Sequence, residues 1–279
     1  MTEAIKIMTF ISVIFVILLV ISGMIPGIVG EIVYYLAFIV AVAIGFYSSN
    51  GLKYKREEVR GLAEPAETLL GFDTERVKKL LPLAFPTVTV VFLFSLVSSL
   101  LLSLFGVKAP AVEVQGIAPM LFLHALIPSF LEEALFRYIP MKLLLPYSKR
   151  WCVIYSALCF ALIHCSFYQM PYAFVAGLIF MIVDVAFGSV WPSVILHFIN
   201  NATSVVWIKY CSGITGYAIF VSSLLAISLI SLFFILRRRK EYRALLFSAL
   251  DKGESSGATY APFALVAITC YIAFVNLLS

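Results

Sequence analysis

The chain has 279 residues, of which 62% are hydrophobic and only 13% are charged, and its mean hydropathy is +1.04. Soluble domains carry roughly 25% charged residues, so this composition excludes an ordinary soluble protein, and a net charge of +5 gives no reason to expect nucleic acid as a partner. The apolar runs do not alternate with polar residues, which favours helices over barrel strands. We therefore predict an all-α fold, a polytopic transmembrane bundle of about eight or nine helices enclosing a cavity.

The apolar runs, taken in chain order, predict the spans. They lie at about 6–27, 31–49, 81–106, 116–140, 151–169, 171–188, 192–209, 214–236 and 261–278. The first run has no strongly basic leader and no Ala-x-Ala site, and a second run follows at once, so we expect a retained helix and not a signal peptide. One integral membrane domain over 1–279 accounts for the chain, with a motif-bearing core at about 116–209.

Basic residues gather in alternate connections between these spans. The connections at about 50–80 and 237–260, and the turn that holds Lys149 and Arg150, are rich in Lys and Arg, whereas the intervening connections hold at most one such residue. Cytoplasmic loops carry this excess, so we predict that the basic connections and the N-terminus are cytoplasmic and the C-terminus is outside. Within 50–80, Asp73 or Thr74 is a candidate N-cap of either a short interfacial helix or a plain connector.

Two adjacent glutamates and an arginine lie inside the fourth apolar run. Charges in a membrane segment are costly and usually face a cavity or one another. Glu133 and Arg137 are spaced i, i+4, which predicts an intrahelical ion pair that lowers the cost of burying both. Glu132 is rotated by about 100° from that pair, and a carboxylate in a cavity without a nearby cation is a better base. A purely structural ion-pair cluster is the alternative.

All three histidines also lie in predicted spans, where hydrogen bonding between helices is the simplest alternative to a functional role. His164 follows Phe160 by four residues and His197 precedes Asn201 by four, so each pair shares a helix face. A His and an Asn on one face provide the two donors that a developing oxyanion needs. The third histidine, His124, lies two turns before the paired glutamates.

Helix rise gives the depth of these side chains. At about 1.5 Å per residue, Glu132 lies about 12 Å above Pro140 and Asn201 at a comparable height, whereas His164 is deeper, at about 20 Å. These heights predict a site reached from the cytoplasmic half. His124 and Asp184 are further candidates for lining or supporting it, although Asp184 is more readily explained as a cap or ion-pair residue near the inner interface.

The three motifs, taken together, resemble a known family. Their order and spacing are similar to those of the CAAX protease and bacteriocin-processing family of intramembrane glutamic endopeptidases, the CPBP or Abi family, over about Leu121 to Ala202. The motifs are Glu132-Glu133-x-x-x-Arg137, Phe160-x-x-x-His164 and His197-x-x-x-Asn201.

The resemblance implies hydrolysis of a peptide bond in a membrane-associated peptide or protein. Glu132 and His164 would activate a water, His197 and Asn201 would stabilise the oxyanion, and Glu133 with Arg137 would hold the site together. No metal or other cofactor is then expected. The alternative is zinc bound by Glu132, His164 and His197, although no HExxH motif is present.

The five cysteines are scattered without CxxC spacing, and we predict that they are packing residues: Cys152, Cys159, Cys165, Cys211 and Cys270.

The sequence says less about the identity of the substrate than about the type of reaction. The connection of about 33 residues between the two histidine motifs resembles bacterial members, which argues against a prenylated substrate and for a bacterial plasma membrane. A non-catalytic bacteriocin-immunity or partner-binding protein of the same fold is the alternative function. A transporter is a third, but no internal repeat supports it. The oligomeric state is not predicted.

Overall fold

The computed structural model describes residues 2–60, 69–107, 116–211, 213–248 and 272. Within these residues all regular structure is helical, which confirms the all-α bundle. The α-helices, with two π-helical segments (η), are α1 (Thr2–Met24), α2 (Ile28–Arg60), α3 (Thr74–Ser103), α4 (Ile117–Leu121), η2 (Phe122–Leu126), α5 (Ile127–Glu133), η3 (Ala134–Tyr138), α6 (Ile139–Leu144), α7 (Lys149–Leu162), α8 (Met170–Phe187), α9 (Trp191–Tyr210), α10 (Gly213–Arg237) and α11 (Arg239–Ser248).

Six helices of the described residues are long and apolar enough to cross a membrane: Thr2–Met24, Val29–Gly51, Val77–Ser103, Ile117–Leu144, Met170–Phe187 and Gly213–Arg237. The chain is therefore a multi-pass integral membrane protein. The expected span 151–169 is wrong in its length, because α7 ends at Leu162 and the chain turns at Cys165, whose φ is 47°. The expected span 261–278 lies outside the described residues, apart from residue 272.

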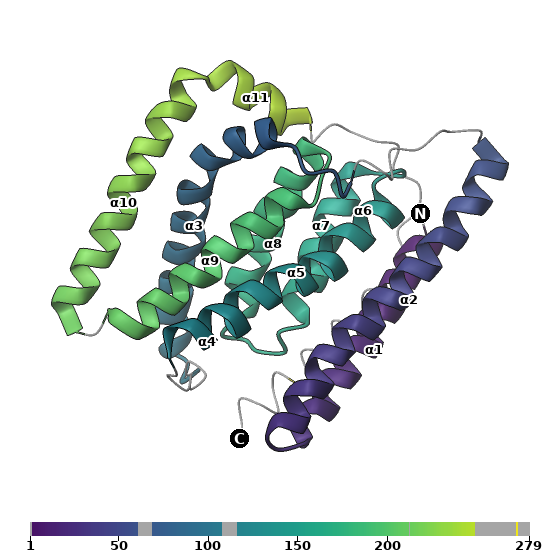
Figure 1. Ribbon diagram of the computed structural model, residues 1–279, viewed down its shortest axis with the longest axis horizontal. Coiled ribbons are helices and arrows are strands. Elements are labelled where there is room, and N and C mark those ends of the chain that lie inside the picture. The colour runs from purple at the N-terminus through teal and green to yellow at the C-terminus, as the bar shows by residue number, and fades with distance from the viewer. Residues whose placement is uncertain (1, 61–68, 108–115, 212, 249–271, 273–279) are drawn as a thin grey trace.

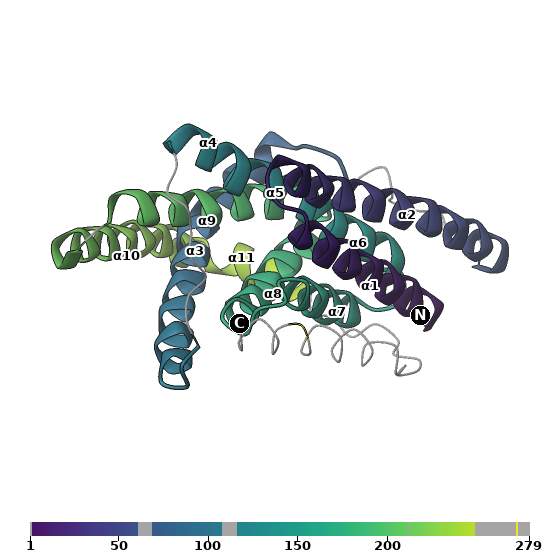
Figure 2. The same cartoon turned by 90° about the horizontal axis from the view of Figure 1, so that it is seen from below.

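The helices form three groups in space. The hairpin of α1 and α2 lies along one edge, α3 and α10 lie together at the other, and the segments from α4 to α9 fill the middle (Figures 1 and 2). Helix α8 contributes to two apolar cores, one shared with α1, α2, α6 and α7 and the other with α3, α9 and α11. The motif-bearing helices are thus held between the α1–α2 hairpin and the pair formed by α3 and α10.

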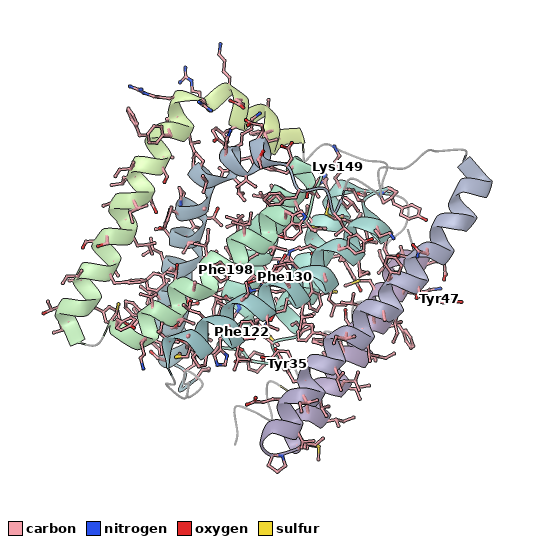
Figure 3. The ribbon with its side chains drawn as sticks, viewed as in Figure 1. Tyr35, Tyr47, Phe122, Phe130, Lys149 and Phe198 are labelled. Atoms are coloured by element: carbon pink, nitrogen blue, oxygen red, sulfur yellow. The ribbon has the colours of Figure 1, made fainter. Side chains whose placement is uncertain are left out.

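The connections alternate between two ends of the bundle. The C-terminal ends of α2, α6, α8 and α10 share one end with the N-terminal ends of α3, α7 and α9 (Figure 1). We call this the basic end, because Lys and Arg residues of the described connections gather there, among them Lys79, Lys149 and Arg237. Lys149 marks this end in Figure 3. The turns α1–α2, α7–α8 and α9–α10 lie at the opposite end, near which Figure 3 labels Tyr35 and Phe122.

At the basic end, α3 and α11 are docked together. Asp73 is the N-cap of α3, as predicted, and its carboxylate accepts a hydrogen bond from the Glu75 backbone N–H at 2.9 Å. No separate interfacial helix precedes the span, because α3 continues through Pro82 and Pro86 in the described chain. Part of the loop expected at 237–260 is the helix α11, and its Glu241 pairs with Lys79 at 2.9 Å. That hydrogen bond lowers the pKa of Glu241.

A short segment before α3 closes the basic end over the α8–α9 turn. The Val190 N–H donates to the Leu69 carbonyl at 3.0 Å, and the Trp191 indole N–H donates to the Leu70 carbonyl at 2.9 Å. The Ser189 hydroxyl donates to the Gly71 carbonyl at 2.9 Å. These bonds fix the start of α9, which carries His197.

Candidate active site

The span that carries the paired glutamates is interrupted by two π-helical segments, η2 and η3, on either side of α5. Such segments often occur at functional sites. Pro140, near the start of α6, has no N–H and leaves the carbonyl of Phe136 without its helical partner. That carbonyl instead accepts hydrogen bonds from the Ser156 hydroxyl of α7 and from Arg137 Nη1, the latter at 3.2 Å. The proline therefore leaves a backbone carbonyl free to accept a hydrogen bond from the buried arginine.

Glu133, Arg137 and His197 form a buried polar cluster. Arg137 Nε lies 3.1 Å from Glu133 Oε2, which confirms the ion pair predicted from their spacing, although the angles of this contact do not make a hydrogen bond. The side chains of both residues are fully buried. Glu133 Oε1 is hydrogen-bonded to His197 Nδ1 at 2.7 Å. Glu133 therefore joins the arginine of its own helix to the imidazole of α9.

Glu132 occupies a different environment from its neighbour. It lines a pocket, and its Oε2 lies 3.8 Å from His197 Nε2. The imidazole of His197 therefore stands between two adjacent carboxylates, with Nδ1 bonded to Glu133 and Nε2 directed toward Glu132. A carboxylate on one ring nitrogen fixes the orientation of the ring.

Phe160 connects the two imidazoles that line the pocket. Its ring meets the ring of His164 edge-on at 5.2 Å and that of His197 at 5.7 Å, centroid to centroid. The Arg137 guanidinium lies 4.5 Å from the centroid of the same ring, in cation–π contact. The spacing of Phe160 and His164 thus has a packing reason, because the one phenylalanine ring contacts both imidazoles and the guanidinium.

His164 lies just beyond the end of α7. Its Nδ1 is hydrogen-bonded to the Phe160 carbonyl at 2.8 Å, one of the carbonyls that a helix end leaves unpaired. This contact leaves Nε2 as the nitrogen available to a reactant. The helix-rise estimate placed His164 at a greater height than Glu132, because α7 starts at the basic end and runs the full distance to the pocket.

The pocket has a volume of about 260 Å³ and brings together all four residues predicted to be catalytic. His124 and Phe160 also line it. The described residues that line it are Met120, His124, Glu132, Phe160, His164, Gln169, Tyr172, Ala173, Ala176, Phe180, His197, Asn200, Asn201, Ser204, Val205 and Ile208. The separate spans therefore converge on one cavity, as the sequence predicted.

Asp184 does not line this pocket. It is fully buried, and its Oδ1 accepts a hydrogen bond from the Ser193 backbone N–H at 2.8 Å, in the first turn of α9. A carboxylate at a helix N-terminus satisfies an unpaired donor and interacts favourably with the helix dipole. Of the roles considered for Asp184, capping is the one found.

Four polar lining residues were not singled out from the sequence: Gln169, Tyr172, Asn200 and Ser204. Their signal was present, since each is polar and lies within or beside an apolar run. The side-chain amide Nδ2 of Asn200 donates to the side-chain oxygen Oδ1 of Asn201 at 3.3 Å. The pair therefore offers its amides to the pocket as a unit.

The pocket does not extend toward the basic end, contrary to the depth estimate. It begins near Glu132 and His197, and its other lining residues on α8 and α9 lie toward the opposite end. Toward the basic end, the side chains of Phe136, Arg137 and Tyr155 are buried.

Metal ligands are not assembled in the part of the chain that the structure describes. No three His, Cys, Asp or Glu side chains there form a group that could hold a metal ion, so Glu132, His164 and His197 do not fit a zinc site as placed. Three of the described cysteines are buried in apolar surroundings, as packing residues would be, and the fourth, Cys211, is partly exposed. Cys270 lies outside the described residues.

Residues 114–203 match the family model described as type II CAAX prenyl endopeptidase Rce1-like. This segment is similar to the CPBP family. It runs from just before α4 into α9 and contains every motif residue that lines or supports the pocket. The match to this peptidase family supports an intramembrane protease of CAAX type at the family level. Comparisons with curated proteins and with solved structures gave no match.

Proposed function

We propose that the protein is an intramembrane glutamic endopeptidase that hydrolyses a peptide bond of a membrane-associated peptide or protein. The observation that carries this proposal is the pocket itself, in which an acid, two imidazoles and an amide from different helices meet inside a membrane bundle. Charged and polar groups at such a position are rare without a functional reason. The protein would act in a bacterial plasma membrane with its basic end in the cytoplasm.

In the proposed reaction, Glu132 with His164 takes a proton from a water held in the pocket. The resulting hydroxide adds to the peptide carbonyl carbon, and the carbonyl oxygen becomes an oxyanion. The proton is then delivered to the leaving nitrogen as the C–N bond breaks, which yields a free carboxylate and an amine. The water supplies both groups, so no metal or other cofactor is needed for the balance.

His197 and Asn201 are the proposed oxyanion donors. The hydrogen bond from Nδ1–H to Glu133 turns His197 Nε2 toward Glu132 and the pocket. When Nε2 is also protonated, the ring donates to the oxyanion from a fixed position. Asn201 lies one turn further along α9 on the same pocket wall and supplies a second donor through its amide.

Glu132→Gln tests the proposal, because it removes the base and keeps the size of the side chain. The substrates are fluorescence-quenched peptides, each tethered to one transmembrane segment, presented to purified protein with and without a chelator. We expect cleavage by the natural chain and a loss of roughly 10²- to 10⁴-fold in kcat for Glu132→Gln. Glu75→Gln, the same substitution at an exposed residue outside the pocket, is the matched control.

Undiminished cleavage by Glu132→Gln would refute the assigned base. If the chelator inhibits cleavage and added zinc restores it, the metal-free mechanism is wrong and a zinc-dependent one takes its place. Cellular function of Glu132→Gln at equal expression, without any cleavage, would instead identify a binding protein of this fold.

A further inference from the structure

The pocket occupies only one half of the bundle. Among its lining residues, Met120 lies in α4, Gln169 immediately precedes α8, and Ile208 lies in the last turn of α9. Each of these positions belongs to a helix terminus at the opposite end (Figure 1). Since α9 starts at the basic end and its first lining residue is His197, the lining begins about 9 Å along the helix and continues to its far end.

Packed side chains lie between Glu132 and the basic end of the bundle. Trp191 lies at the start of α9 between the rings of Phe72 and Phe130, at centroid distances of 5.5 Å and 6.0 Å. Its indole N–H is bonded to the segment that precedes α3. Below this layer, Arg137 and Phe136 are fully buried. A substrate arriving at the basic end would have to displace this packing.

The open half carries more polar groups than the proposed hydrolysis uses. His124, Gln169, Asn200 and Ser204 line the pocket between the four catalytic residues and the opposite end. Polar side chains at membrane depth mark water-filled paths. Amides can pair with the donors and acceptors of an extended peptide backbone, which needs such partners when it leaves water.

We propose that the substrate reaches Glu132 from the opposite end of the bundle, as an extended peptide segment whose backbone lies along Gln169, Asn200 and Ser204. With the basic end in the cytoplasm, this is the extracytoplasmic side. The substrate class is therefore a peptide whose cleavage site lies at or beyond the outer leaflet, and not a cytosolic protein tail. The cleavage itself rests on the proposed function, whereas the side of access does not.

Thiol labelling tests the side of access without reference to catalysis. Single cysteines are placed in the full chain with its five native cysteines replaced by Ser or Ala, and intact cells are treated with a membrane-impermeant maleimide. Ser204→Cys reports on the pocket. Val206→Cys, on the same helix but outside the pocket and 38% exposed on the bundle surface, is the matched control for a thiol facing lipid. Pro26→Cys marks the opposite end and Arg239→Cys the basic end.

We expect the maleimide to label Ser204→Cys and Pro26→Cys in intact cells. Ser204→Cys should react at least roughly tenfold faster than Val206→Cys, because only a hydrated thiol ionises and reacts readily. Arg239→Cys should react only in inverted vesicles. The proposal is overturned if Ser204→Cys is labelled only from the side on which Arg239→Cys reacts, or if it is labelled from neither side. Expression and thermal unfolding of each variant verify its fold. Since no substrate is added, a failure here is distinct from failure of the proposed hydrolysis.

Discussion

Neighbouring glutamates in this protein have unequal surroundings, and that difference arises from one side chain of the same helix and one of a distant helix. Glu133 contacts a cation on its own helix and an imidazole on α9, whereas Glu132 faces the pocket. One residue of rotation along the helix is enough to separate a structural carboxylate from a candidate base. The same pattern of charges would be far less informative on a solvated helix.

Arg137→Met should be strongly destabilising, because it leaves Glu133 buried without its cation. Breaking a buried pair by removing one partner costs about 3–5 kcal/mol, while replacing both partners by neutral side chains costs much less. We therefore expect Arg137→Met to lower the free energy of unfolding in detergent by about that amount and Glu133→Gln with Arg137→Met to recover much of it. Equal stability of Arg137→Met and the natural chain would show that the pair does not matter for folding.

Phe160→Leu should impair turnover more than folding. Leucine keeps most of the apolar volume, so the loss of stability should be about 1–2 kcal/mol. The two imidazoles lose the ring that positions them, and a small displacement of reacting groups can lower kcat by up to about 10²-fold. The measurement is kcat and KM for a tethered peptide, with kcat expected to fall and KM to change little.

Phe180→Leu is the matched control for Phe160→Leu, because its ring contacts His197 at 5.7 Å and lies further from Arg137, at 5.8 Å. Equal losses of kcat in the two variants would contradict a special role of Phe160.

At the scale of single elements, helices α7 and α8 approach closely at a glycine. A Cβ on Gly177 would lie 2.9 Å from the Cα and 3.2 Å from the Cβ of Ala157. Because Ala157 presents backbone there, the contact cannot be relieved by a rotamer change. The close approach holds the Phe160 motif of α7 against the wall of the pocket that α8 provides.

Gly177→Ala should therefore destabilise the protein by about 1–3 kcal/mol, the usual cost of overpacking. Gly23→Ala is the control, since a Cβ there meets nothing within 4 Å and alanine is the better helix former. Thermal unfolding in the same detergent compares the two variants. A Gly177→Ala protein as stable as Gly23→Ala would mean that α7 and α8 can separate at no cost.

The sequence predicted most helices but not their irregularities. Hydropathy located the spans that became α1, α2, α8 and α10, because each is a long apolar run. It placed the end of α7 too late, since Ile163 and Cys165 are apolar and only the backbone turn stops the helix. The π-helical segments beside α5 could not be predicted from the sequence, because a π turn depends on packing around the helix and not on hydrophobic periodicity.

The candidate site was predictable only in part. Spacing of four residues identified the Glu133–Arg137 pair, a contact within one helix. The bond between Glu133 and His197 joins residues 64 apart, and nothing local in the sequence specifies it. The same holds for the polar lining beyond the catalytic residues, which becomes visible as a set only when α8 and α9 lie side by side.

At the scale of the whole molecule, two asymmetries point in opposite directions along the bundle. Basic residues gather at the end that Lys149 marks in Figure 3. The residues that line the pocket lie toward the other end. The helix-rise estimate predicted access from the basic half, because it measured the height of each residue from the cytoplasmic end. It took no account of the side chains that are packed in that half. The direction in which the cavity extends is a property of packing among several helices.

Topology is therefore the prediction on which the biology of this protein depends. The excess of Lys and Arg at the basic end predicts that a reporter active only in the cytoplasm works when inserted after Arg238, between α10 and α11, and fails when inserted after Pro26, between α1 and α2. A reporter active only outside the cytoplasm should give the reverse result. If both results are inverted, the basic residues do not set the orientation, and the same pocket would then serve cytosolic peptides. The orientation of the bundle thus decides which population of peptides the protease can cut, whatever the chemistry at Glu132.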